Sequence, residues 1–399
     1  MTGEQLTSSG RTHATPLGRA KDGTALYVHL PFCAAKCHYC DFFSVPDEGH
    51  DVDAMVEAIL EEAAVRAPHA PRTLFVGGGT PSLLTAAQLA RLLDGLDALT
   101  GWRDSALETT AETNPESLDV DKARAFLDLG ITRLSIGFQS LENETLELYG
   151  RVHSTADSFR AFGAARDAGV EHLNVDLIYA APGQTPAAWT RDLARVLELG
   201  PDHLSAYNLT FEEDTRFKRL LDRGRLEKAS EDVELEMFHA TRALTSEAGL
   251  VAYEISNFAR PGEECLHNLG YWRNEEYVGL GPGAVSKIDH ARGGNPRAIQ
   301  PYLRRIKDKG VALEWREDPA PAARLGETWW LGLRLLEGVD AARARHISAY
   351  TQETDPTAPI QAELLEHDLL ERRSDGRLAL SGRGLPLADA VAKRFLDTE

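Results

Sequence analysis

Three cysteines lie close together near the start of the chain. Cys33, Cys37 and Cys40 form a C-x3-C-x2-C pattern, and this spacing allows three thiolates to converge on one metal centre. Structural zinc sites and ferredoxin clusters each use four protein ligands. Three thiolates therefore predict a centre with one unfilled metal position, at which an open iron could bind a substrate or a cofactor.

Two other interpretations of the cysteines stay open. A zinc ion completed by His29, His38 or Cys265 would use the same loop, and unligated thiols would need no metal at all. Disulfide pairing is disfavoured, because only four cysteines occur in 399 residues and we expect a cytoplasmic protein, whose thiols stay reduced.

The cysteine loop follows the first of six predicted strands. Short runs rich in β-branched and aromatic residues alternate with amphipathic segments, a pattern typical of βα units around a parallel sheet. The predicted strands are 24–30, 72–78, 106–112, 132–138, 172–179 and 203–209, and the predicted helices between them are 53–65, 86–99, 120–129, 156–168 and 187–199. Because a complete TIM barrel needs eight units, the sequence predicts an α/β fold with an open (β/α)6 partial TIM barrel.

Polar and glycine-rich segments follow the strands, and functional groups of βα barrels lie at these carboxyl ends. Glu112 and Asp176 can accept hydrogen bonds from ribose hydroxyls or an amino group, Arg151 can pair with a carboxylate, and Gln139 can both donate and accept. Each could equally be a helix cap or a salt-bridge partner. The three glycines at 77–79 could let a cofactor approach the backbone closely, or could simply form a turn.

The remaining chain predicts two further parts. Residues 1–23 are polar and rich in threonine, which predicts a disordered lead. A core spans residues 24–290 and includes a helix at 232–247, a strand at 251–259 and a long aromatic loop up to about residue 286. Residues 291–399 predict a helical α+β unit, in which the SDGR turn between apolar runs indicates a β-hairpin wing.

The composition narrows the classes of partner. Forty-three Lys and Arg residues against 62 Asp and Glu residues give a net charge of −19, which repels phosphates, so we expect no nucleic-acid partner. The sequence contains no run of 18 apolar residues, so we expect no transmembrane segment. Residues 1–23 also lack the apolar stretch of a signal peptide. These features predict a cytoplasmic protein.

At its cysteines the chain resembles the radical S-adenosylmethionine (SAM) superfamily. That resemblance implies a [4Fe-4S] cluster on Cys33, Cys37 and Cys40, with SAM on the open iron. The motifs YVHLPFCAAKCHYCDF, GGGTPS, ETNPES, SIGFQS and NVDLIYAAPGQT resemble, over residues 27–286, the branch containing anaerobic coproporphyrinogen III dehydrogenase and the HemW-type heme chaperones. Positions that match SAM contacts of this branch are Tyr27, Tyr39, Gly78, Gly79, Thr80, Glu112, Gln139, Arg151 and Asp176.

Three features favour the chaperone side of this branch. Phe42 occupies the position at which the dehydrogenase has a further cysteine. The residues before Tyr27 are polar and do not resemble the extension that covers the substrate in the dehydrogenase. HNLGYW, residues 267–272, matches the HNxxYW signature of HemW-type chaperones. The match implies His267 as an axial heme ligand, with Cys265 as a second candidate donor.

The resemblance therefore implies a heme-binding chaperone that passes heme to heme-dependent respiratory enzymes and has a winged-helix-like tail. A homodimer is one possibility, with the cluster organising either the protein itself or its dimerisation. We expect no coproporphyrinogen dehydrogenase activity, although oxygen-independent coproporphyrinogen III dehydrogenase is the alternative function. A radical enzyme that modifies RNA is a third hypothesis, which the acidic charge disfavours.

Overall fold

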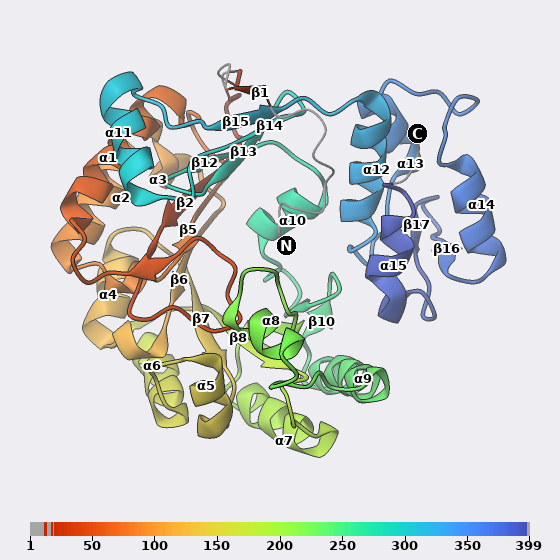
Figure 1. Ribbon diagram of the computed structural model, residues 1–399, viewed down its shortest axis with the longest axis horizontal. Coiled ribbons are helices and arrows are strands. Elements are labelled where there is room, and N and C mark those ends of the chain that lie inside the picture. Colours follow the sequence, from red (N-terminus) through yellow and green to blue (C-terminus); the bar gives the residue numbers. More distant parts are fainter. Residues whose placement is uncertain (1–11, 14–16, 19, 397–399) are drawn as a thin grey trace.

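The computed structural model describes residues 12–13, 17–18 and 20–396. A 13-stranded sheet forms the centre of this described part, and the six strands predicted from the sequence run parallel to one another within it (Figure 1). In spatial order these strands are β2 (Ala25–Leu30), β5 (Thr73–Gly78), β6 (Glu108–Thr113), β7 (Arg133–Gln139), β8 (His172–Tyr179) and β9 (His203–Asn208). All six predicted strands are confirmed, with small shifts at their ends.

The connecting helices also match the predicted segments. They are α1 (Val52–Arg66), α2 (Ala86–Thr100), α4 (Val120–Asp128), α6 (Thr155–Ala168) and α7 (Pro186–Leu197), with the short helices α3 (Trp102–Ser105) and α5 (Asn143–Tyr149) beside them. Side-chain oxygens of Asp51, Thr85, Asp119, Ser154 and Thr185 accept from backbone N–H groups at their first turns, so the starts of these five helices are locally encoded.

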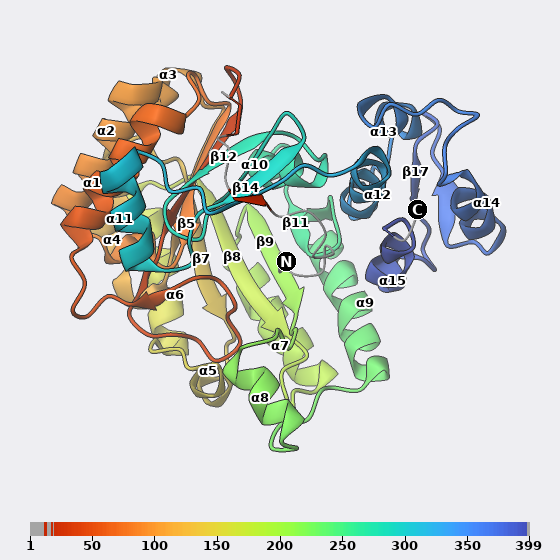
Figure 2. The same cartoon turned by 45° about the horizontal axis from the view of Figure 1, so that its top comes forward.

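The strands have one apolar face and one polar face. In β2, Leu26, Val28 and Leu30 are buried in the main hydrophobic core, and helices cover that side of the sheet (Figure 2). Tyr27 and His29 alternate with them and therefore point to the inner face. Polar residues of this inner face form the site described below.

Both edges of the six-stranded core are extended. On the β2 side lie β12 (Tyr277–Leu280), β13 (Val285–Ile288), β14 (Ala291–Gly294), β15 (Trp315–Glu317) and β1 (Thr12–His13), and on the β9 side lie β11 (Asn257–Ala259) and β10 (Val251–Ala252). Strands β14 and β15 thus belong to the central sheet although they follow residue 290. The helix α11 (Ile299–Lys309) contacts α1.

Two predicted segments of the core differ from the structure. The single strand expected at 251–259 is the hairpin of β10 and β11, because Tyr253 N–H bonds to Asn257 O at 3.2 Å and reverses the chain. The expected loop before residue 286 contains the helix α10 (Leu266–Trp272) and the strand β12. The local sequence does not predict these two elements, because the segment is rich in glycine and charged residues and has no apolar periodicity. Tertiary contacts stabilise them instead.

The C-terminal segment packs around its own hydrophobic cluster. Its elements are α12 (Pro321–Gly332), α13 (Ala341–Ile347), α14 (Ala358–Glu366), β16 (Leu370–Arg372), β17 (Leu378–Leu380) and α15 (Ala388–Lys393). Trp329 stacks on Phe395 at its centre, with ring centroids 4.7 Å apart. The predicted hairpin is confirmed as β16 and β17, whose turn includes Gly376 at φ +90°. This segment lies beside α9 (Glu231–Glu247) and α10 (Figures 1 and 2).

Among the described helices, none combines the length and the apolar character that a bilayer crossing requires.

Candidate functional site

The cysteine loop lies directly after β2, at the carboxyl end of the parallel strands. Cys33 ends the short strand β3 (Phe32–Cys33), which pairs with β4 (Val45–Pro46). Cys40 N–H bonds to Cys37 O at 3.4 Å, and all three thiols are free and partly exposed. Burial raises the pKa of Cys33, and it raises the pKa of Cys40 to about 11. A cation close to Cys33 and Cys40, such as a metal ion, would favour their thiolate form.

Within the described ranges, no group of three or more His, Cys, Asp or Glu side chains is arranged to hold a metal ion. The structure thus places the three cysteines on one loop, and their convergence on one metal stays a prediction.

The three candidate fourth ligands for zinc have other partners. His29 Nε2 donates to Phe43 O at 2.7 Å and its Nδ1 accepts from the Tyr27 hydroxyl at 2.9 Å. His38 Nδ1 donates to Leu148 O at 2.8 Å, while its Nε2 accepts from Arg216 in α8 (Arg216–Asp222).

Cys265 is buried at the opposite end of the strands from the cysteine loop, where its thiol donates to Glu108 at 3.3 Å. Since neither histidine nor Cys265 is available in this arrangement, the loop offers three thiols rather than a closed set of four ligands.

Arg151 reaches the cysteine loop from the segment after α5. Its guanidinium lies 3.5 Å from Cys37 Sγ and donates to Asn114 Oδ1 at 2.6 Å and to Gly137 O at 3.1 Å. Asn114 also donates to Thr80 Oγ1 at 2.8 Å. These hydrogen bonds bring three of the strand ends together. A positive charge is thereby fixed beside the thiols, where it favours their anionic form.

Two carboxylates lie on the inner face near the same strand ends. Glu112 accepts from Gly78 N–H at 2.9 Å, and burial raises the pKa of Glu112 to about 7. Asp176 accepts from Ser135 at 2.7 Å and from Asn174 at 2.8 Å, and burial raises the pKa of Asp176 too. Neither has a cationic side chain within ion-pair distance among the described residues. Both are therefore suited to accept hydrogen bonds from an incoming ammonium group or from hydroxyl groups.

Gln139 ends β7 beside this group. Its φ of +65° is unusual for glutamine, and the pairing of β7 with β8 is interrupted between Gly137 and Gln139. Such bulges redirect a side chain at the rim of a sheet. The interrupted pairing and the positive φ of Gln139 therefore set the direction of its side chain, which lies near Gly137 and Arg151.

The glycine segment is required by the packing of the protein itself. A Cβ on Gly79 would lie 2.3 Å from Phe32 O, and one on Gly78, whose φ is +107°, would lie 2.5 Å from His29. Gly79 N–H and Thr80 N–H donate to Leu30 O and Phe32 O. These glycines therefore hold the cysteine loop against β5, and their role in the close approach of a cofactor stays a prediction.

The two predicted tyrosines occupy different places. Tyr39 packs between Tyr149 and Phe217, with ring centroids 5.1 and 6.3 Å away. Tyr27 lies in the middle of β2 on the inner face, where its ring is 6.1 Å from Phe75. Only Tyr39 lies in the cysteine loop itself.

His267 lies at the opposite end of the strands from the cysteines. It is only 2% exposed, and its Nδ1 bonds to the hydroxyl of Thr73, the first residue of β5, at 2.8 Å. Its Nε2 bonds to the Tyr271 hydroxyl at 3.0 Å. Burial lowers the pKa of His267 to about 3, so the ring is neutral. Both ring nitrogens are thus occupied, and the structure does not bring His267 together with the cysteines.

Glu108 fixes the helix that carries His267. This carboxylate, at the start of β6, accepts from Leu266 N–H at 2.8 Å and from His267 N–H at 3.1 Å. Sequence reasoning missed Glu108 and Thr73, because it considered side chains at the carboxyl ends of strands. Asn114 belongs to the ETNPES motif, but its role in joining Arg151 to Thr80 is visible only in the structure.

The donor set fits an iron-sulfur cluster with SAM in three respects. The loop supplies three thiols, and each of the three candidate fourth ligands has another partner. Arg151 supplies a compensating charge, and the carboxyls of Glu112 and Asp176 lack cationic partners among the described residues.

Comparisons with known proteins agree with this chemistry. Residues 27–196 match the family described as the Radical SAM superfamily. The heme chaperone HemW of Bacillus subtilis is 34% identical over 375 residues, covering 93% of this chain and 98% of the relative. HemW of Mycobacterium tuberculosis strain H37Rv is 36% identical over 380 residues, covering 93% and 94%.

Among solved structures, coproporphyrinogen III oxidase (HemN) from Escherichia coli, described as a radical SAM enzyme, has a TM-score of 0.81 at 24% identity, covering 94% of this chain and 91% of that one. At this identity the likeness shows a shared α/β fold with a mostly parallel sheet. The HemW relatives are above 30% identity and are covered almost completely. The chain therefore belongs to the HemW family of radical SAM proteins.

Proposed function

We propose that this protein is a heme chaperone with a radical SAM core, which binds heme and delivers it to heme-dependent respiratory enzymes. Similarity to proteins named heme chaperone HemW over nearly their whole length carries the proposal. The HNLGYW helix α10, docked against the inner face of the sheet, supports it. We further propose a cytoplasmic location, a homodimer, and no nucleic-acid partner.

The core would hold a [4Fe-4S] cluster on Cys33, Cys37 and Cys40, with SAM completing the coordination. When bound, these groups supply one-electron chemistry. Arg151 would orient the cysteine loop through its contact with Cys37. SAM would be held by the inner-face and strand-end residues, namely Tyr27, Tyr39, Gly78, Gly79, Thr80, Glu112, Gln139, Arg151 and Asp176.

The proposed architecture is an open (β/α)6 partial barrel, followed by a winged-helix-like C-terminal unit. The separate hydrophobic cluster around Trp329 and the hairpin of β16 and β17 support such a unit. Because β14 and β15 belong to the central sheet, we place the border between the two units at about residue 318. Residues 1–23, proposed as a disordered lead, lie mostly outside the described residues.

Heme ligation by His267 would require one of its two hydrogen bonds to open. The Tyr271 hydroxyl is the partner that we propose is released, since it lies one helical turn away on the same helix and a change of the Tyr271 χ1 rotamer would move it away from His267. The neutral ring that burial maintains is the form that binds iron. Cys265 is a weaker candidate donor, because its buried thiol is bonded to Glu108 and burial raises its pKa well above the usual value.

Oxygen-independent coproporphyrinogen III dehydrogenase is the second candidate, favoured by the shared fold with HemN. Anaerobic reconstitution followed by parallel heme titration and coproporphyrinogen turnover separates the two functions. We expect heme binding without turnover. Turnover of coproporphyrinogen would establish the dehydrogenase instead.

His267→Ala should weaken heme binding and leave the iron-sulfur absorbance intact. His203→Ala is the matched control, because His203 is also buried with both nitrogens bonded, to Asn174 and to Tyr253, but lies outside the motif. Unchanged heme affinity and an unchanged Soret spectrum in His267→Ala would place the ligand elsewhere.

A further inference from the structure

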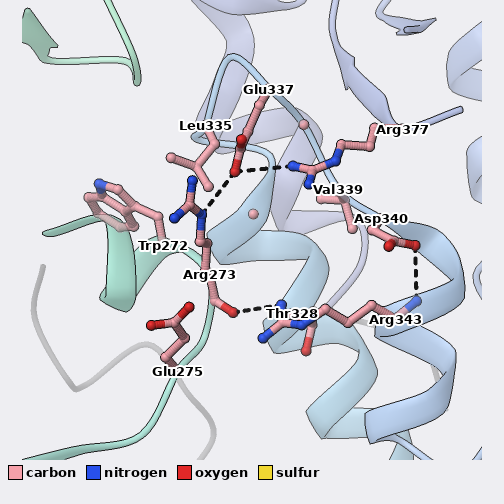
Figure 3. Close-up of a pocket in the computed structure, with 12 residues that line it drawn as sticks. Trp272, Arg273, Glu275, Thr328, Leu335, Glu337, Val339, Asp340, Arg343 and Arg377 are labelled. Atoms are coloured by element: carbon pink, nitrogen blue, oxygen red, sulfur yellow. Dashed lines mark hydrogen bonds and ion pairs between the residues drawn. The ribbon is translucent and has the colours of Figure 1, made fainter. Parts of the chain in front are cut away.

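A pocket lies between the end of α10 and the C-terminal unit. Its volume is about 180 Å³, and its lining includes Trp272 and Arg273 from the end of α10, Arg343 from α13 and Arg377 from the hairpin. Figure 3 shows the Arg273 side chain extending towards Glu337, while the Arg343 side chain reaches the backbone of Arg273. Three guanidinium groups from separate segments thus meet where the two parts of the chain join.

The acidic residues of this pocket already have partners. Glu337 bridges Arg273 and Arg377, at 3.0 and 3.1 Å. Asp340 accepts from two backbone N–H groups at the start of α13, at 2.9 and 3.0 Å. Glu275 faces Arg72 at 3.7 Å, from the segment before β5.

Arg343 differs from the other two arginines. One of its nitrogens donates to the backbone oxygen of Arg273 at 2.9 Å, which fixes the guanidinium at the pocket. Within the described ranges, no carboxylate lies within ion-pair distance of Arg343. A positive charge is thus held in place in a pocket that Arg273 also lines, and a guanidinium group favours a planar anion that accepts two parallel hydrogen bonds.

We propose that this pocket binds a carboxylate of heme, namely one of its propionate side chains, with Arg343 and Arg273 as donors and the Trp272 ring as an apolar wall. The inference rests on the proposed function and deepens it. Pockets that enclose whole drug-sized ligands measure roughly 300–1,000 Å³, so a cavity of about 180 Å³ takes a carboxylate side chain but not the macrocycle.

The position of the pocket suits this ligand. Trp272 is the last residue of α10, and His267 precedes it by five residues, or about 7.5 Å of helical rise. The pocket therefore lies at the end of the helix that carries the proposed heme ligand. The pocket also joins α10 to the C-terminal unit, because Glu337 and Arg343 both contact Arg273.

The test is a Soret titration of the full-length protein with heme and with heme dimethyl ester, in which both propionates are esterified. Arg343→Ala should weaken heme binding about 2- to 5-fold, because Arg343 is exposed and water weakens the ion pair that is lost. The variant and the wild-type protein should bind the diester equally. Arg304→Ala is the control, since Arg304 is an exposed arginine on α11 and should bind heme as the wild-type protein does.

Arg343 is exposed, so its replacement should leave the thermal unfolding midpoint close to that of the wild-type protein. Equal heme affinity in Arg343→Ala and the wild-type protein would overturn the inference and leave the proposed function standing. Equal weakening for heme and for the diester would also overturn it, because the lost contact would then not be with a carboxylate. Absence of heme binding by the wild-type protein would refute the proposed function and this inference with it.

Discussion

Replacing Glu108 should release the helix that carries the HNLGYW motif while leaving the parallel sheet intact. The Glu108 carboxylate is 7% exposed and accepts from the first two amides of α10 and from the Cys265 thiol. It also lies 3.7 Å from Arg133. In Glu108→Ala these donors lose their acceptor within a buried region.

The cost follows from the contacts. Loss of a helix cap costs about 1 kcal/mol, and leaving a buried donor unsatisfied costs about 1–3 kcal/mol. Arg133 keeps Glu263 at 3.5 Å, so its charge retains one partner and the full penalty of an unpaired buried ion does not arise. We therefore expect the free energy of local opening of α10 to fall by roughly 2–4 kcal/mol.

Amide hydrogen exchange measures this opening directly. Since each 1.4 kcal/mol is a factor of ten, protection of amides 266–272 should fall by about 30- to 700-fold in Glu108→Ala. Glu108→Gln keeps an acceptor oxygen and should lose much less. The control is Glu57→Ala, which removes an exposed ion pair with Arg91. It should change the exchange protection of amides 266–272 by less than a factor of about five. Unchanged protection of 266–272 in Glu108→Ala would refute the assignment of Glu108 as the cap of this helix.

Two further predictions concern the cysteines and pH. Alanine at Cys33, Cys37 or Cys40 should abolish the broad visible absorbance of the reconstituted iron-sulfur cluster, whereas Cys265→Ala should keep it; a full cluster after all three replacements would contradict the assignment. Burial lowers the pKa of His29 to about 4 and of His267 to about 3, so the unfolded chain binds more protons below pH 6.5 and stability should fall from pH 6.5 towards pH 4. Each histidine contributes up to about 1.4 kcal/mol per pH unit. The unfolding free energy of His267→Gln, measured by chemical denaturation over this range, should depend less steeply on pH than that of the wild-type protein. The difference in slope should correspond to about one bound proton. An identical slope would show that His267 is not buried as a neutral ring.

Much of the fold could be predicted because its signals are local. The strand patterns and the capping side chains at Asp51, Thr85 and Ser154 are each encoded within a few residues. The hairpin of β16 and β17 was predicted for the same reason, because its glycine turn is contiguous in sequence. The helix α10 was missed, since its N-terminal cap is a carboxylate 158 positions away from Leu266.

The sequence by itself determined which side chains could do chemistry: three thiols at fixed spacing on one loop, polar residues after each strand, and a histidine motif near residue 267. Only the tertiary structure decided what those side chains face. It bonded His29 to Tyr27 and Phe43, joined Arg151 to Asn114 and Cys37, and placed His267 against Thr73, at the far end of the strands from the cysteines. The physical reason is that a motif's residue types and spacing are covalent properties of a short segment, whereas burial and hydrogen-bond partners depend on which distant strands the sheet brings together.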